Sequence, residues 1–309
     1  MITTVTLNPA IDRTVVVENF QFGSVNRVSR SREDIGGKGI NVARIMLALG
    51  SEAVATGFMG TRNLGHTRNL LERDLIKYRF VDIDAETRQN TKLIDSSSNS
   101  TTDLNEPGFF ITAQNLTDLK VLIDEFSANS NWIVFSGSTP PGVPDTIYRD
   151  LLGRLPGHCR GVLDADGALL RRGLEAGPYL IKPNIDELER SLSRQLSSKE
   201  AIVAAAREII FQHDVSIVLV SMGGEGSILI TADQALHAAA LPVAVKNTVG
   251  AGDSMLAGMI HSLATGLAIR PALACATACG ALAVSKEGTE TISRCEAEKL
   301  TNKVKICVL

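Results

Sequence analysis

The chain has 309 residues, of which 44% are hydrophobic and 21% charged, a balance typical of a globular protein with a large buried core. Its formal net charge is -3 and its lysines and arginines form no basic block, so we expect no nucleic-acid partner. The 5 cysteines are odd in number and make no C-x-x-C motif, which argues against a disulfide framework and a zinc site. Without a signal-peptide pattern or an apolar run that reads as a membrane span, the sequence predicts a soluble, cytoplasmic protein with no membrane partner.

Strand patterns of two kinds open the chain. Residues 2–7 form a short β-type run that predicts a strand, and Asp12 follows in a polar loop, where α/β sheets place ligand contacts. The short strand patterns within residues 11–35 and 87–112 are instead polar on one face, unlike central parallel strands. We expect these two segments to form one accessory β layer, a lid that faces a ligand.

A glycine-rich turn, I-G-G-K-G at residues 35–39, opens a helical pattern that stops at Gly50. The turn matches neither the G-x-x-x-x-G-K-[ST] phosphate loop nor the G-x-G-x-x-G dinucleotide motif. Lys38 and Asn41 have side chains that suit an oxyanion or sugar hydroxyls. As a bare glycine cluster the turn carries little information.

From residue 116 onward, helical and strand patterns alternate, which predicts a parallel sheet with helices on both faces. Polar and glycine residues gather where the predicted strands end, and the main ones are Asp12, Ser136, Lys182, Asn184, Gly223 and Gly226. In an open α/β sheet this edge is the ligand crevice. We therefore expect residues 1–309 to form one α/β domain that carries the small β lid.

The stretch N-T-V-G-A-G-D-S at residues 247–254 stands between an apolar run at 241–245, which predicts a strand, and a helical pattern. Gly250 and Gly252 allow the backbone to approach a ligand closely. The free N–H groups of the first helical turn favour an anion such as phosphate. Asp253 is then either a helix-dipole partner or a base that takes a proton from a hydroxyl attacking a phosphoryl group.

Four motifs in this order resemble those of the ribokinase-like (PfkB) sugar kinases. They are G-G-K-G-I-N-V-A at 36–43, K-P-N-x-x-E at 182–187, S-M-G-G-E-G at 221–226 and T-V-G-A-G-D-S at 248–254. The similarity covers essentially the whole chain. It implies a three-layer α/β/α fold with a mostly parallel central sheet.

Within the family, the sequence is most similar to the 1-phosphofructokinases. The stretches that carry this likeness are T-L-N-P-A-I-D at 6–12, N-R-V at 26–28, T-R-Q-N-T-K-L at 87–93 and T-T-D-L-N-E-P-G at 101–108. Two stretches depart from the family pattern. Thr139 stands where Leu is expected, and L-D-A-D-G at 163–167 stands where D-[ST]-S is expected.

The resemblance assigns roles to individual residues. It implies that Asp253 is the general base and that the backbone of Gly250, Ala251, Gly252 and Asp253 is an anion hole. The implied sugar-phosphate contacts are Asp12, Arg27, Gly37, Lys38, Asn41, Arg88 and Ser136. The implied ATP contacts are Lys182, Asn184, Ser221, Gly223, Gly226, Thr248, Val249 and Gly280. Mg²⁺ would be held by Asn184 and Glu187 through water, and a monovalent cation such as K⁺ by the backbone near Val249 and Gly288.

The implied reaction is ATP-dependent phosphorylation of the 6-hydroxyl of D-fructose 1-phosphate, which gives fructose 1,6-bisphosphate. Tagatose-6-phosphate kinases and 6-phosphofructokinases share most of the motifs and stay open as alternatives. A non-catalytic sugar-phosphate sensor is the alternative from another class, and the intact G-A-G-D argues against it. The exposed edges of the lid predict a homodimer that pairs through the lid.

Overall fold

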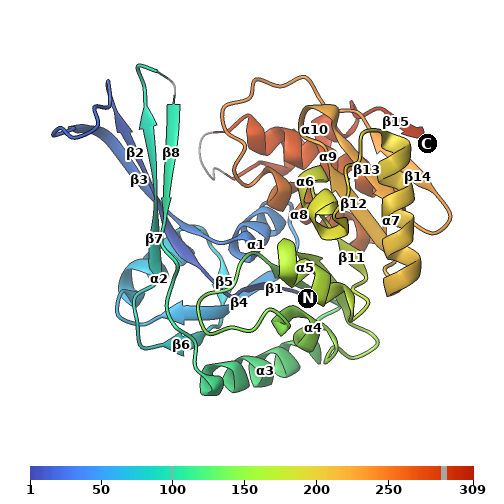
Figure 1. The fold of residues 1–309 in the computed structure, drawn as a ribbon, viewed down its shortest axis with the longest axis horizontal. Coiled ribbons are helices and arrows are strands. Elements are labelled where there is room, and N and C mark those ends of the chain that lie inside the picture. Colours follow the sequence, from blue (N-terminus) through green and yellow to red (C-terminus); the bar gives the residue numbers. More distant parts are fainter. Residues whose placement is uncertain (99, 287–290) are drawn as a thin grey trace.

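An 11-stranded sheet runs through the part of the chain that the computed structural model describes, residues 1–98, 100–286 and 291–309 (Figure 1). Its strands are, in spatial order, β15 (Ile306–Val308), β14 (Ala235–Ala238), β13 (Ser227–Ile230), β12 (Ile217–Ser221), β11 (Leu180–Ile181), β10 (Arg160–Asp164), β9 (Trp132–Ser136), β1 (Ile2–Thr6), β4 (Ala53–Gly60) and β5 (Lys77–Tyr78), with β6 (Val81–Ile83) also paired to β4. The strands from β12 to β4 are parallel, and β13, β14 and β15 are antiparallel. The predicted mostly parallel sheet is confirmed.

Helices cover both faces of this sheet (Figure 1). They are α1 (Lys38–Ala48), α2 (Leu64–Arg73), α3 (Ala113–Ser127), α4 (Ile147–Leu152), α5 (Gly167–Leu174), α6 (Ile185–Leu192), α7 (Lys199–His213), α8 (Ala251–Ala264), α9 (Ile269–Val284) and α10 (Arg294–Thr301), with a 3-10 turn η1 (Gly223–Glu225). None of the helices among the described residues has the length and apolarity to cross a membrane.

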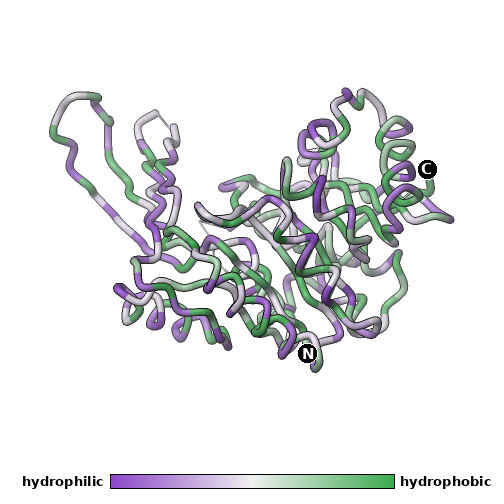
Figure 2. Tube along the Cα trace, turned by 60° about the horizontal axis from the view of Figure 1, so that its bottom comes forward, coloured by the Kyte–Doolittle hydropathy of each residue, from purple (hydrophilic) through white to green (hydrophobic). Residues whose placement is uncertain are grey.

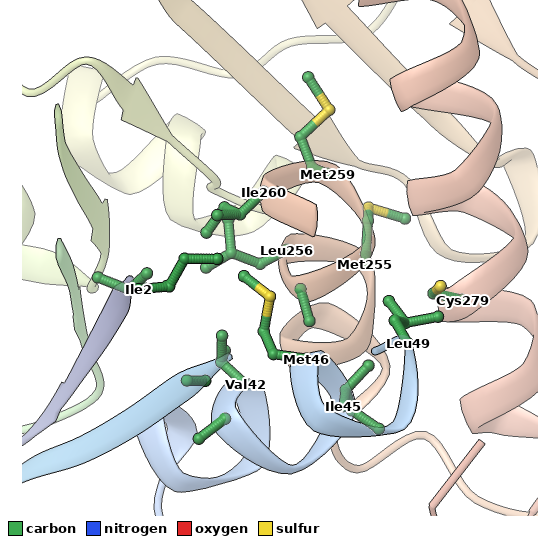
Figure 3. Packing of buried hydrophobic residues seen from close by; sticks show 14 of the residues in the cluster. Ile2, Val42, Ile45, Met46, Leu49, Met255, Leu256, Met259, Ile260 and Cys279 are labelled. Carbon is green, nitrogen blue, oxygen red and sulfur yellow. The ribbon is translucent and has the colours of Figure 1, made fainter. Parts of the chain in front are cut away.

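Alternate residues of each central strand enter two separate cores. In β9, Val134 packs with α1, α8 and α9, whereas Ile133 and Phe135 pack with α3, α4 and α5. Both faces of β9 are buried, which is why this strand is almost continuously apolar. Figure 3 shows the first core, where Met46 of α1, Ile2 of β1 and further apolar side chains of α8 gather. This packing holds α1 and α8 side by side on one face of the sheet.

A second sheet of four strands projects from the main body (Figure 1). Its order is β3 (Val28–Gly36), β2 (Ala10–Val17), β7 (Arg88–Asp95) and β8 (Ser100–Asn105). Figure 2 shows hydrophilic and hydrophobic positions mixed along these strands, as expected for a thin layer with solvent on one side. The sheet corresponds to the predicted accessory layer, and we call residues 10–36 and 88–105 the lid.

The structure differs from the sequence predictions at several places. Residues 106–112 were expected in the lid but belong to the body, because Phe109 and Ile111 are buried in the core with α3. Asp12 was expected in a loop but lies inside β2. Residues 241–245 were expected to form a strand but form none, and strands β14 and β15 were not predicted. The run at 241–245 is apolar because it lines a cavity, and Pro242 lacks the N–H group that a central strand needs.

Candidate active site

A cavity of about 1050 Å³ opens at the carboxyl ends of the parallel strands. Its wall contains Thr6 at the end of β1, Ser136 at the end of β9 and Ser221 at the end of β12. The predicted site residues that line it are Asp12, Gly37, Lys38, Asn41, Arg88, Ser136, Lys182, Asn184, Glu187, Ser221, Gly223, Gly226, Thr248, Val249, Gly250, Ala251, Gly252, Asp253 and Gly280. Residues from both halves of the chain and from the lid therefore meet in one cavity.

Arg27 is the predicted site residue that the structure does not bring to this cavity. It is exposed and precedes β3, whose first residue, Val28, pairs with Val17 at the outer end of the lid. Asp12 lies five residues earlier on β2, toward the body. A strand rises about 3.3 Å per residue, so the length of the lid separates Arg27 from the cavity of its own chain.

The second glycine turn places backbone N–H groups at one end of the cavity. Gly250 is the N-cap of α8 and has φ 77°, a left-handed conformation that glycine adopts without strain. The helical hydrogen bonds begin when Ser254 N donates to Gly250 O at 2.9 Å. Residues 250–253 of the preceding first turn line the cavity, and backbone amides at a helix N-terminus favour an anion.

Asp253 is a buried carboxylate in this first turn. Its Oδ2 accepts a hydrogen bond from Asn41 Nδ2 at 2.8 Å. Burial raises the pKa of Asp253 above its ordinary value, although the charge of Lys38 opposes the shift. A simple helix-dipole partner on the surface would have a lowered pKa, so the environment favours the alternative role of a base.

Two lysines share one buried carboxylate beside the start of α8. Asp164 Oδ1 lies 3.0 Å from Lys38 Nζ and 3.4 Å from Lys182 Nζ. Burial alone would raise the pKa of Asp164, but Lys182 and Lys38 outweigh it and the pKa is lowered. A β-carbon on Gly252 would lie 3.1 Å from Lys182 Nζ, so this ammonium group sits against the helix start. The cluster holds two cations where phosphate charge is expected.

Asp164 was not predicted as a site residue and stands in the sequence only as part of a departure from the family pattern. A usable signal was its position at the end of β10, at the same edge of the sheet as Ser136. Its two cationic partners come from residues 126 and 18 positions away, and no sequence pattern links them.

The lid contributes a hydrogen-bonded pair, Asp12 and Asn90, to the wall of the cavity. Asp12 of β2 pairs with Asn90 of β7, and Asn90 Nδ2 donates to Asp12 Oδ1 at 3.0 Å. Burial raises the pKa of Asp12, against the lowering effect of this hydrogen bond. Asn90 also lines the cavity and was not predicted. Because strand side chains alternate, its spacing of two from Arg88 already placed both on one face.

Arg88 anchors the base of the lid. Its guanidinium donates to the carbonyls of Glu106 at 2.7 Å, Asn8 at 3.1 Å and Pro9 at 3.4 Å. A guanidinium has five N–H donors, so two stay available to a ligand. Ser136, at the end of β9, is fully buried, and its hydroxyl has no hydrogen-bond partner among the described residues.

The K-P-N-x-x-E motif forms a helix cap. Asn184 is the N-cap of α6, and its Oδ1 accepts from Glu187 N at 2.7 Å. Glu187 Oε2 accepts in turn from Asn184 N at 2.9 Å. Among the described residues, no group of three or more His, Cys, Asp or Glu side chains could enclose a metal ion. One carboxylate can still hold Mg²⁺ that is coordinated mainly by phosphate and water.

The remaining part of the cavity is more apolar. Its wall includes Leu241, Val243 and Val284 beside the predicted Thr248 and Gly280. Small residues of α9 let this wall approach α8 closely, since a β-carbon on Gly280 would lie 3.3 Å from Met255 Cε. Gly288, predicted near a monovalent cation, lies outside the described residues.

Comparisons with known proteins agree with this geometry. The pattern of the pfkB family carbohydrate kinases matches residues 5–295. The chain belongs to this family. It is 37% identical over 284 residues to the 1-phosphofructokinase of Rhodobacter capsulatus, covering 90% of this chain and 88% of the relative. It is 32% identical over 309 residues to the 1-phosphofructokinase of Vibrio cholerae, covering 100% and 97%.

Among solved structures, this pfkB family chain resembles Escherichia coli phosphofructokinase-2 in complex with potassium. The TM-score is 0.92 at 28% identity, with 98% of each chain covered. The predicted family and ribokinase-like fold are thereby confirmed. As a carbohydrate kinase of this family, the protein is a phosphotransferase that acts on a sugar hydroxyl.

Proposed function

We propose that the chain transfers the γ-phosphoryl group of ATP to the 6-hydroxyl of D-fructose 1-phosphate, giving fructose 1,6-bisphosphate and ADP. The observation that carries the proposal is the place of Asp253. This buried carboxylate lies in one cavity with an anion hole and with the polar lid pair Asp12–Asn90. Full-length relatives named 1-phosphofructokinase support the choice of acceptor.

In the reaction, the 6-oxygen attacks the γ-phosphorus while Asp253 accepts the hydroxyl proton. The new bond joins the 6-oxygen to phosphorus, and the bond from phosphorus to the ADP oxygen breaks. The raised pKa of Asp253 makes its carboxylate a stronger base than an exposed aspartate. Because Asn41 binds only Oδ2, the other oxygen stays available to the sugar.

Backbone amides and two lysines balance the negative charge on the transferring phosphoryl group. The amides at the start of α8 are a preorganised set of donors that needs no rearrangement during the reaction. Lys38 and Lys182 add positive charge, and Asp164 holds both ammonium groups in place. The lysines come from different elements, so the folded sheet edge is needed to bring them together.

Mg²⁺ fits the carboxylate of Glu187, which lines the cavity and uses one oxygen in the α6 cap. We assign Glu187 to hold the ion through water and Asn184 to orient Glu187, because the Asn184 side chain already caps the helix. At that position the ion would supply positive charge to offset that of the ATP phosphates. ATP itself is assigned to the wall that contains Ser221, Gly223, Gly226, Thr248, Val249 and Gly280.

The sugar phosphate is assigned to the lid side of the cavity. Asp12 and Asn90 face the hydroxyls, and Arg88 and Lys38 hold the 1-phosphate. The unpartnered hydroxyl of Ser136 is a further contact for the sugar. Lid residues close over the substrate, which excludes water and limits ATP hydrolysis.

Three further parts of the proposal concern a homodimer, a monovalent cation and the cellular compartment. The lid exposes apolar side chains, with Phe22 at 97% and Val25 at 91% of full exposure, and pairing of two lids in a homodimer would cover them. A monovalent cation near Val249 is proposed because the Escherichia coli relative was solved with potassium. We place the enzyme in the cytoplasm, since all five cysteines are free thiols.

The test is an ADP-release assay with fructose 1-phosphate, tagatose 6-phosphate and fructose 6-phosphate as acceptors, with Asp253→Asn as the inactive control. We expect kcat/KM for fructose 1-phosphate to exceed the others by at least about 100-fold, because a phosphate on the wrong end leaves the cations of the sugar site unpaired. Phosphorus NMR of the product then locates the new phosphate at carbon 6. A higher kcat/KM for either of the other two acceptors would overturn the proposed substrate.

A further inference from the structure

Arg44 is a buried cation that has no part in the reaction described above. It lies on α1, one turn after Asn41, and only 4% of it is exposed. Its Nε donates to Asp74 Oδ2 at 2.8 Å, and its Nη2 donates to the carbonyl of Ile35 at 2.6 Å. A buried charge is costly unless its hydrogen-bonding groups are satisfied, so these anchors hold the guanidinium in one orientation.

The third contact of Arg44 leads toward the active site. Its Nη1 donates to Asn41 Oδ1 at 2.7 Å, and Asn41 Nδ2 donates to Asp253 Oδ2 at 2.8 Å. The four side chains therefore form a continuous line of hydrogen bonds from Asp74 at the end of α2 to the carboxylate of Asp253. Arg44 itself does not line the cavity.

The donor and the acceptor of each hydrogen bond in this line are fixed, because an arginine side chain can only donate. An amide can turn over and exchange its oxygen and nitrogen, but an oxygen turned toward the carboxylate of Asp253 would repel it. Facing Arg44, the amide of Asn41 must present its oxygen. Its NH₂ group is then left for Asp253, which needs a donor.

We infer that Arg44 is a positioning residue for the catalytic base: it fixes the amide of Asn41 so that Asp253 keeps Oδ2 bonded and offers its other oxygen to the sugar hydroxyl. The inference rests on the proposed role of Asp253. It assigns Arg44 no contact with substrate. The anchors explain why the guanidinium stays in place, since Ile35 belongs to the lid strand β3 and Asp74 is the C-cap of α2.

Several charged groups act on Asp253, and the test must separate them. Lys38 of α1, Lys182 after β11 and Asp164 of β10 all influence its protonation, together with the hydrogen bond from Asn41. Replacing Arg44 leaves the first three in place. A change in the protonation of Asp253 in such a variant therefore reports on the amide and on the lost guanidinium charge.

The experiment compares Arg44→Met, Arg44→Gln and Arg44→Lys for kcat, KM and the pH profile of kcat. Met removes every donor and Gln can donate or accept, so neither enforces the amide orientation, whereas Lys only donates. For Met and Gln we expect kcat to fall about 10- to 100-fold and its acid limb to move up by about one pH unit, the size of one hydrogen bond to a charged group. KM for both substrates should change less than about threefold, because no substrate contact is lost. Lys should recover most of kcat.

Leu71→Ala is the matched control for general destabilisation, because Leu71 is buried in α2 beside the same core but touches none of the four residues by a hydrogen bond. It should lower the melting temperature without moving the acid limb. If Arg44→Met does not fold, the comparison of Gln with Lys decides. Equal losses of kcat in Gln and Lys with an unmoved acid limb would overturn the inference, as would wild-type kinetics in Met.

The acceptor in this experiment is the sugar phosphate that the wild-type protein phosphorylates best. A preference for an acceptor other than fructose 1-phosphate therefore overturns the proposed function and leaves the test of Arg44 intact. A shifted acid limb in Asp253→Glu, with no shift in the Arg44 variants, would contradict the positioning role while keeping Asp253 as the base.

Discussion

The two glycine-rich turns of this protein look alike in sequence but differ in what surrounds them. At the first turn, a β-carbon on Gly37 would lie 2.6 Å from Thr6 Cγ2, and one on Gly39 would lie 2.5 Å from Thr6 Oγ1 and 2.8 Å from Val5 O. At the second turn, a β-carbon on Gly250 would have no heavy atom within 4 Å among the described residues. The first turn is closed against strand β1, and the second is open to the cavity.

This difference separates two reasons for a glycine before a helix. Gly39 is needed because α1 packs against the backbone of β1, a structural demand. Gly250 is needed for its left-handed φ and leaves room in front of the helix start, where a phosphate fits. At the first turn the side chains of Lys38 and Asn41 line the cavity, and at the second the residues Gly250 to Asp253 do so.

The largest expected effect concerns the second turn. Asp253→Asn should lower kcat by about 10³-fold or more, because the base is lost while the anion hole remains. ATP binding, measured by calorimetry, should stay within about threefold of wild type, since the backbone donors are unchanged. Turnover near that of wild type would remove Asp253 from the role of base.

The same variant should be more stable than the wild type at neutral pH. Burial raises the pKa of Asp253 in the folded protein, so protonation stabilises the fold below the unfolded pKa and this contribution is lost as the pH rises through the raised pKa. Asparagine resembles the protonated form at every pH. We expect a melting temperature about 2–4 °C higher at pH 8 and no difference near pH 3. A lower melting temperature of the variant at pH 8 would contradict the raised pKa.

Because the first turn is closed against β1, adding a side chain at one of its glycines should destabilise the protein. Gly39→Ala should destabilise the protein by about 1–3 kcal/mol, because the new methyl group meets backbone atoms of β1 that cannot move aside. Denaturant unfolding measures the change. The control is Gly65→Ala in α2, where a β-carbon has open space and alanine should stabilise slightly. Equal stability of the two variants would mean that the first turn is not closed.

On the lid side, Arg88→Ala should raise KM for the sugar phosphate by about 10- to 100-fold and leave KM for ATP nearly unchanged, because a charged hydrogen bond to phosphate is lost. Initial-rate kinetics with each substrate varied separates the two constants. Arg62→Ala is the matched control, since Arg62 is exposed and paired with Asp84 away from the cavity. An unchanged KM for the sugar phosphate would remove Arg88 from that site.

The smallest effect is expected for Gly252→Ala in the open turn. Its β-carbon would approach only the flexible end of Lys182, at 3.1 Å, so the free energy of unfolding should change by less than about 1 kcal/mol. KM for ATP should rise less than about tenfold, as the ammonium group shifts. A loss of stability as large as that of Gly39→Ala would show that both turns are closed.

Much of the site could be predicted because its motifs are local. The amides at residues 250–253 and the cap of Asn184 and Glu187 each lie within a few residues, so spacing alone describes them. Asp164 was missed because its partners, Lys38 and Lys182, reach it only across the folded sheet. Arg27 lies outside the cavity of its own chain, and a motif gives no measure of how far a strand carries a residue outward.

The apolar run at residues 241–245 is a second feature whose place in the fold the sequence alone did not reveal. Its composition suited a strand, but Leu241, Pro242, Val243 and Val245 line the cavity instead. Hydrophobic pattern reports that a surface must be covered and leaves open whether protein or ligand covers it.

By itself, the sequence determined the alternating elements, the two glycine turns, the lid segments and the family, because hydrophobic period, turn residues and motif order are properties of neighbouring residues. Only the tertiary structure decided which turn is closed and which is open, that Asp164 holds two lysines, and that Asn41, which accepts from Arg44, donates to Asp253. These features depend on distances between residues that are far apart in the chain, and packing of the sheet and its helices sets those distances.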